Sequence, residues 1–213
     1  MKQITPFRNL AEASQALDNG GHFLSFRSRK DDGIITKAEL RRAAGAFSNK
    51  QKMMLFLELS MTGLSESEQT QIVRQLEPGL QAVYQEYKPA RFNAKEAREQ
   101  GEISQGLIVT GIPKMLHSAK EFRGFIMIPI NTGTVTTFTM IPLIDRYDVY
   151  EIRDEATDVT CLVAHAKGKQ KLPEHKIQVA GVLKELKAKK DEPQENDKFL
   201  EVLYHYDPQA QPV

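Results

Sequence analysis

A chain of 213 residues can form one large domain or two small ones, and its 40% hydrophobic and 27% charged residues are ordinary for a folded globular protein. The 29 basic and 28 acidic residues nearly cancel to a formal net charge of +1, which counts against a high-affinity binder of nucleic acid. The single cysteine, Cys161, excludes an intramolecular disulfide scaffold, and no apolar run has the length of a membrane helix, so we expect a cytoplasmic protein with no membrane partner.

Helical patterns follow one another through the first hundred residues. Apolar residues recur at helical spacing, and each run is preceded by a residue that favours a helix start. The segment around residues 53–59 is apolar most of the way round, so it is expected to be the buried helix of a small helical bundle over residues 1–101. The predicted helix starts are Thr5 with Pro6, Thr36 with Glu39, Ser48 or Asn49, Ser65 with Glu68, Pro78 and Asn93.

After Gly101 the periodicity changes from helical to extended. Segments rich in β-branched and aromatic residues alternate with turn signals, which predicts short strands. Strands at this number and spacing indicate an antiparallel sandwich or barrel over residues 102–213, so the fold class is α+β. The predicted strands cover residues 103–112, 125–130, 135–144, 149–152, 159–164, 177–186 and 199–206.

Two of these strands repeat one short sequence. The letters FIMIPI at 125–130 are echoed by FTMIPL at 138–143, and a glycine turn at 131–133 predicts a hairpin between them. Proline cannot donate to a strand ladder, so the strands should end, bulge or lie at an edge near Pro129 and Pro142. The first strand is apolar on both faces and needs a cover, for which we expect the helical half, with a partner chain as the alternative.

Four segments of the second half resemble the later strands of the OB-fold family. Two motifs stand out, the V-x-G-x-L sequence of residues 179–183 and the F-L-E-V sequence of residues 199–202. Gly181 would lie where a strand bends sharply to close a barrel, a bend that a residue without a Cβ allows. The resemblance implies an OB-like β-barrel domain over residues 102–213, preceded by a helical domain over 1–101. The four segments are residues 150–154, 158–164, 177–186 and 199–203.

OB-folds commonly bind single-stranded nucleic acid by stacking bases on aromatic rings beside a basic groove. The resemblance therefore implies a binding protein for single-stranded nucleic acid or another oligomeric ligand. The alternative for the same residues is that Phe199 belongs to the core and the lysines are solvated loop residues. The candidate nucleic-acid-binding residues are Tyr147, Tyr150, Arg153, Lys184, Lys187, Lys189, Lys190, Tyr204 and Tyr206.

A second hypothesis is a protein-interaction or assembly module that uses residues 125–143 and the helical domain as its docking surface, with a partner protein or a second copy. Near-neutral charge favours this hypothesis, whereas the OB resemblance favours nucleic acid.

Residues for chemistry are sparse. The five histidines show no metal-binding spacing, so neither a metal nor a cofactor is expected. Cys161 and His165 would share a strand face, but the alternation with neighbouring valines points the thiol into the core, where it is inert. We therefore expect a binding protein rather than an enzyme; a small hydrolase or transferase would need carboxylates and a histidine that converge in a cleft.

Overall fold

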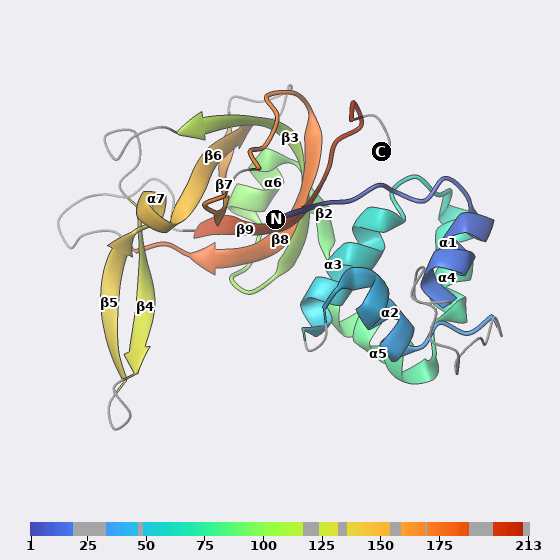
Figure 1. Cartoon of the computed structure of the whole chain (residues 1–213). Coiled ribbons are helices and arrows are strands. Elements are labelled where there is room, and N and C mark those ends of the chain that lie inside the picture. The colour runs from blue at the N-terminus through green and yellow to red at the C-terminus, as the bar shows by residue number, and fades with distance from the viewer. Residues whose placement is uncertain are drawn as a thin grey trace.

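The computed structural model describes residues 1–18, 33–46, 49–116, 124–131, 136–153, 159–168, 170–187 and 198–210. The fold is α+β, as expected. Helices α1 to α5 lie together at one end of the molecule, a strongly curved sheet occupies the middle, and the β4–β5 hairpin projects at the other end (Figure 1).

The predicted helix starts are largely confirmed. Thr36 and Ser65 each form both hydrogen bonds of a capping box, and Asn49 accepts from the backbone N–H of Lys52. The first helix begins later than Thr5, because Asn9 Oδ1 accepts from the N–H of Glu12 at 2.9 Å and so caps it. The helices are α1 (Leu10–Asp18), α2 (Lys37–Ala44), α3 (Lys50–Ser60), α4 (Glu66–Gln75), α5 (Pro78–Tyr87), α6 (Ala94–Glu99) and α7 (Leu143–Arg146).

Helix α3 is the buried centre of the helical region, as its all-round apolar sequence predicts. Every residue from 53 to 60 is buried, and the helix contacts α2 and α5 on one side and strands β8 and β9 on the other. Tyr204 from the sheet joins this core: its ring meets Phe56 edge-on and its hydroxyl donates to the Ala44 carbonyl at 3.3 Å. The helices therefore cover one outer face of the sheet.

The strands match the predicted segments closely, and two short strands were not predicted. These two, β1 and β2, lie in the first half of the chain and join the edges of the sheet. The strands are β1 (Lys2–Gln3), β2 (Ala90–Phe92), β3 (Gly106–Leu116), β4 (Phe125–Asn131), β5 (Thr136–Pro142), β6 (Tyr147–Arg153), β7 (Thr160–Ala166), β8 (Ile177–Glu185) and β9 (Lys198–Tyr206).

Five strands form a closed ring of hydrogen bonds. Going round, β3 pairs with β6, β6 with β7, β7 with β9, β9 with β8, and β8 with β3 again. The prediction of a purely antiparallel sheet is wrong, because β1 pairs with β9, β2 with β3 and β7 with β9 in parallel. The sheet is mixed, and its ring is closed by a parallel pair.

Helix α6 explains why the helices are not a single N-terminal bundle. It is the crossover between the parallel strands β2 and β3, and such strands need a crossover rather than a tight turn. Its two fully buried residues, Ala94 and Ala97, pack in the core of the ring with Tyr150, Val163 and Leu200, not with α1 to α5. A helix from the first hundred residues therefore belongs to the strand ring.

Gly181 marks an irregularity in the ring, as predicted. The register between β8 and β9 shifts between Ala180 and Gly181, and a Cβ built on Gly181 would lie 2.2 Å from the carbonyl oxygen of Glu201. Only a residue without a side chain lets the two backbones come this close.

The hairpin does not pack where we expected. Helices α1 to α6 do not cover it; Ile126 packs with Leu143 and Phe199 in a small core on the outside of the ring. The two prolines fit their predicted roles: β5 ends at Pro142, and Pro129 lies in a strand that pairs with β5 on one side. Of the turn predicted at 131–133, residues 132 and 133 lie outside the described part of the chain.

Candidate functional site

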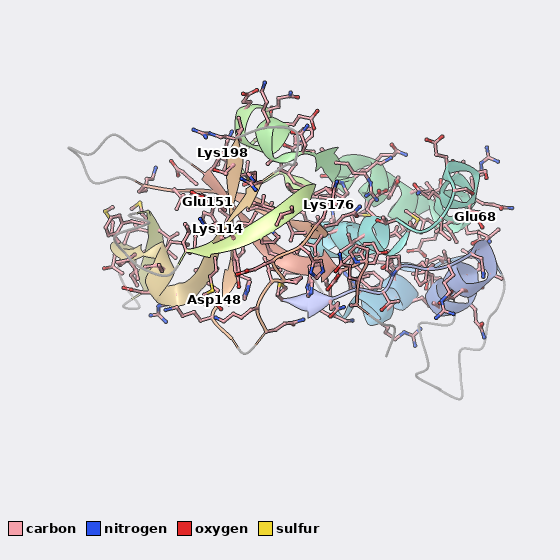
Figure 2. All side chains as sticks on the ribbon, turned by 90° about the horizontal axis from the view of Figure 1, so that it is seen from above. Glu68, Lys114, Asp148, Glu151, Lys176 and Lys198 are labelled. Carbon is pink, nitrogen blue, oxygen red and sulfur yellow. The ribbon has the colours of Figure 1, made fainter. Side chains whose placement is uncertain are left out.

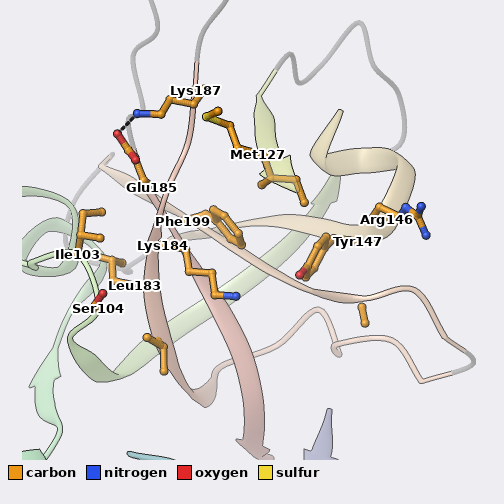
Figure 3. A pocket seen from close by; sticks show the side chains of 13 residues that line it. Ile103, Ser104, Met127, Arg146, Tyr147, Leu183, Lys184, Glu185, Lys187 and Phe199 are labelled. Atoms are coloured by element: carbon orange, nitrogen blue, oxygen red, sulfur yellow. Dashed lines mark hydrogen bonds and ion pairs between the residues drawn. The ribbon is translucent and has the colours of Figure 1, made fainter. Parts of the chain in front are cut away.

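A pocket of about 760 Å³ lies between the ring and the hairpin (Figure 3). Its walls come from segments that are far apart in the sequence: the start of β6, the ends of β7 and β8, the start of β9, and β4 of the hairpin. The apolar lining residues are Ile103, Ile126, Met127, Ala166, Val182, Leu183 and Phe199, and the polar ones are Ser104, Arg146, Tyr147, Lys184, Glu185 and Lys187.

Tyr147 and Lys184 face each other across one carboxylate. Lys184 Nζ lies 2.6 Å from Glu201 Oε2, and the Tyr147 hydroxyl donates to Glu201 Oε1 at 2.8 Å. Burial raises the pKa of Tyr147 to about 12, and the hydrogen bond to Glu201 adds to this rise. Burial alone would raise the pKa of Glu201, but the hydrogen bonds from Lys184 and Tyr147 outweigh it and lower that pKa. The tyrosine is therefore neutral and the glutamate ionised at neutral pH.

Two more cations border the pocket. Lys187 forms an ion pair with Glu185, and its backbone exchanges hydrogen bonds with Phe125, so the segment after β8 is tied to the hairpin. Arg146 ends the short helix α7 and is exposed. Among the described lining residues, Arg146, Lys184 and Lys187 are basic and Glu185 is acidic, and Glu201 pairs with Lys184 beside them, so this part of the pocket is mildly positive.

The structure brings three of the nine predicted residues together and places four others, Tyr150, Arg153, Tyr204 and Tyr206, elsewhere. Tyr147, Lys184 and Lys187 line the pocket. Arg153 lies at the other end of β6, about 20 Å along the strand from Tyr147. It shares an outer face of the sheet with Lys114 and Glu151, which are cross-strand neighbours (Figure 2).

Two of the four predicted tyrosines cannot offer a ring to a base. Tyr150 is 1% exposed inside the ring, and Tyr204 is 6% exposed beneath the helices, so the prediction of a four-tyrosine stacking face is wrong for both. Tyr206 ends β9, opposite Gln178 and far from the pocket. Lys189 and Lys190 lie outside the described residues. Phe199 is 1% exposed, which confirms the alternative that it belongs to the core.

Sequence reasoning missed Arg146 and Glu201. Glu201 was read only as part of the F-L-E-V motif, although its place between two buried apolar residues of a strand marks it as outward-facing. No sequence pattern indicated Arg146, because its position depends on the one-turn helix α7. That helix is held in place by the packing of Leu143 with Val149 and Phe199, which are distant in the sequence or on other elements.

A second polar cluster lies on inward-facing positions of β6 and β7. Tyr150 Oη accepts a hydrogen bond from the N–H of Leu172 at 3.2 Å and lies 3.4 Å from His165 Nε2. Asp148 holds Lys171 at 2.6 Å. Asp148 and His165 are 4% and 2% exposed, so this carboxylate and histidine converge inside the ring rather than lining the pocket. Tyr150 and Asp148 fasten residues 171–172 to the ring.

Cys161 is buried in the ring, where burial raises the pKa of its thiol to about 12, so it is a poor nucleophile. Within the described residues, no three side chains of histidine, cysteine, aspartate or glutamate gather in a group fit for a metal ion.

No protein-family model matches the chain, and no curated protein matches it. None of the helices in the described part of the chain combines the length and the apolar character that a membrane span requires.

Proposed function

We propose that this chain is a non-enzymatic binding protein whose five-strand ring is an OB-type barrel, and that the pocket holds single-stranded nucleic acid or a similar oligomeric anion. The order of the strands supports the first part. If the ring strands β3, β6, β7, β8 and β9 are numbered one to five along the chain, their order round the ring is 1-2-3-5-4 and back to 1. The pair between strands three and five, β7 and β9, is parallel. A five-stranded Greek-key barrel is the OB architecture.

The position of the pocket supports the second part. OB-folds bind oligomers between the loop that joins strands one and two and the loop that joins strands four and five. Here the first connection contains the hairpin and Arg146, and the second, after β8, contains Lys187. The pocket is lined by residues of both connections.

One observation carries the proposal: the fold places a tyrosine beside three cations in one pocket. Tyr147 supplies a partly buried ring, and Arg146, Lys184 and Lys187 supply positive charge for phosphates. Because Lys184 and Lys187 already pair with Glu201 and Glu185, a phosphate must compete with two carboxylates. Binding should therefore be moderate in affinity and sensitive to salt.

The proposal assigns binding to residues 102–213 and a supporting role to the helices of residues 1–101. It places the protein in the cytoplasm, the compartment expected from its lone cysteine. It requires no metal, cofactor or catalytic residue.

The test is a fluorescence-anisotropy titration of a labelled single-stranded oligonucleotide at two salt concentrations. We expect saturable binding with a log–log salt slope of about −2, because three cations that each meet one phosphate contribute about −0.7 apiece. A variant with Arg146, Lys184 and Lys187 changed to alanine should lose most of the affinity and of the slope.

The matched control changes Arg74, Lys95 and Lys114 to alanine, which removes the same charge from exposed positions outside the pocket. Equal losses in both variants would indicate a general charge effect and contradict the pocket. No binding by the wild type even at low salt would overturn the proposal.

A further inference from the structure

The hairpin differs from the rest of the chain in having no charge at all. Although 27% of the residues are charged, not one residue from Gly124 to Ile144 is acidic or basic. Natural sheets protect exposed edge strands with charged residues, because an unprotected edge pairs with other strands. Because it has no charged residues, this hairpin can be buried against another uncharged protein surface without desolvating a charge.

One face of the hairpin exposes large apolar side chains. Met127, Phe138 and Met140 are 47%, 61% and 46% exposed, and they are three of the five large hydrophobic residues that are exposed within the described part of the chain. Met127 and Met140 are direct cross-strand partners, and Phe138 follows on the same face of β5. They form one continuous patch, whereas Ile126 on the opposite face packs against the ring.

The outer edge of β5 is also available. The N–H and C=O of Phe125 bind Lys187, on the side of β4 away from β5, so Phe125 and its partner Pro142 are a non-hydrogen-bonded pair of the hairpin. Hydrogen-bonded and non-hydrogen-bonded pairs alternate along an antiparallel ladder, so Phe138 and Met140 of β5 also belong to non-hydrogen-bonded pairs. Their backbone N–H and C=O groups therefore point away from β4. In the described residues no strand pairs with this edge.

The repeated sequence gives the patch a local two-fold symmetry. An antiparallel pair has a two-fold axis between opposed residues, and the axis between Met127 and Met140 carries each residue of β4 onto the one thirteen positions later in β5. The sequence repeat has this same spacing of thirteen residues. The axis therefore places Phe125 on Phe138, Met127 on Met140 and Pro129 on Pro142. The ribbon therefore presents the same groups in either direction.

We infer that the outer edge of β5 pairs antiparallel with the same edge of a second copy of this chain, which brings the two apolar hairpin faces side by side in one sheet. A two-fold dimer needs a surface complementary to itself. The patch satisfies this need. When two β5 edges pair antiparallel, Met140 of one copy can lie beside Met140 of the other, and no charged side chain of the hairpin is buried. A charged partner would bury its charges against this face without compensation.

The size of the patch predicts a weak dimer. Two seven-residue strands make a ribbon about 24 Å long and about 10 Å wide, and such a contact buries less than the roughly 1,200 Å² of the smallest stable interfaces. We expect reversible association with a dissociation constant on the order of tens of micromolar.

The test is sedimentation velocity of the full chain from low to high micromolar concentration. The wild type should shift from monomer toward dimer. A variant with Phe138→Glu and Met140→Glu should associate about tenfold more weakly or not at all, because it places like charges in the patch. The control, Ile34→Glu, changes a residue that is 48% exposed but lies in the helical half, and it should dimerise like the wild type.

A further variant, Met140→Pro, tests the edge. It removes an N–H that points away from β4, so the hairpin ladder stays intact while edge pairing is blocked. An unaffected dimer in Met140→Pro would overturn the edge pairing. A wild type that stays monomeric throughout, or an undiminished dimer in the double glutamate variant, would overturn the whole inference. Met127 borders both the patch and the pocket, but neither Phe138 nor Met140 lines the pocket, so these variants test association without changing a pocket residue.

Discussion

Lys184 on β8 and Tyr147 on β6 hold the two oxygens of a single carboxylate, that of Glu201 on β9. The contacts measure 2.6 Å and 2.8 Å. They join three strands at the rim of the pocket. Under the proposed function, Glu201 also neutralises a lysine that would meet a phosphate, and so weakens the attraction of the pocket for an anion.

Changing Glu201 to glutamine should therefore strengthen oligonucleotide binding. The amide keeps an acceptor for Tyr147 but releases Lys184, so we expect affinity to rise several-fold. The salt slope should stay at about −2, because Lys184 is already one of the three cations counted as meeting a phosphate. The control is Glu99→Gln, an exposed change on α6 outside the pocket. If Glu201→Gln and Glu99→Gln behave alike in the anisotropy titration, Lys184 does not contact the ligand.

Gly181→Ala should destabilise the protein markedly. Its Cβ would lie 2.2 Å from a backbone oxygen of β9, and a backbone clash is relieved only by moving a strand. We expect a loss of about 2–4 kcal/mol in the free energy of unfolding by urea. The matched variant Gly79→Ala lies in α5, where an added Cβ meets nothing within 4 Å, and should stabilise by about 0.4–1 kcal/mol. Equal effects of the two changes would contradict the close approach at Gly181.

Tyr84→Phe should show how α5 is fastened to α3. The Tyr84 hydroxyl donates to Glu58, a carboxylate that is 2% exposed and also lies 3.4 Å from Arg91 of β2. Without the hydroxyl, a buried carboxylate oxygen loses its donor, at a cost of about 1–3 kcal/mol in urea unfolding. Tyr87→Phe, in the same helix, should change stability by less than about 0.5 kcal/mol. A neutral Tyr84→Phe would mean that water replaces the lost donor.

Acidification below neutral pH should destabilise the fold through His165 and His205. Both are 2% exposed, and burial lowers the pKa of each. The unfolded chain then binds more protons than the folded chain below the ordinary histidine pKa, so stability falls as the pH drops through that range. The slope is at most about 1.4 kcal/mol per pH unit for each histidine.

Urea midpoints at a series of pH values from about 7.5 down to about 5.5 measure this dependence. His205→Gln should flatten it, because one of the two groups no longer titrates. An unchanged slope in that variant would show that His205 already takes up its proton in the folded state.

Local signals predicted much of the fold, because helix caps and strand alternation act within a few residues. The capping boxes at Thr36 and Ser65 and the irregularity at Gly181 are confirmed. The strands β1 and β2 were missed, because two or three residues show no period and their pairing partners lie far along the chain.

The candidate site was harder to predict because it depends on which way each side chain faces. Tyr147 and Tyr150 are three residues apart on β6, so they point to opposite faces, one into the pocket and the other into the ring. Tyr204 was hidden by a helix whose docking position no local pattern reveals. The expectation that the helical half covers the hairpin was wrong for the same reason, since no local pattern shows which element packs against it.

The pairing of β1 with β9 has a consequence for the order of folding. Lys2 lies beside Tyr204, and the N–H of Ile4 donates to the carbonyl of His205 at 2.8 Å. During synthesis this early segment must wait for residues made some two hundred positions later, and the ring, closed by β9, must wait with it. The helices form from local contacts, so their face that meets β9 stays uncovered until then, a period in which a nascent chain is open to aggregation or to chaperones.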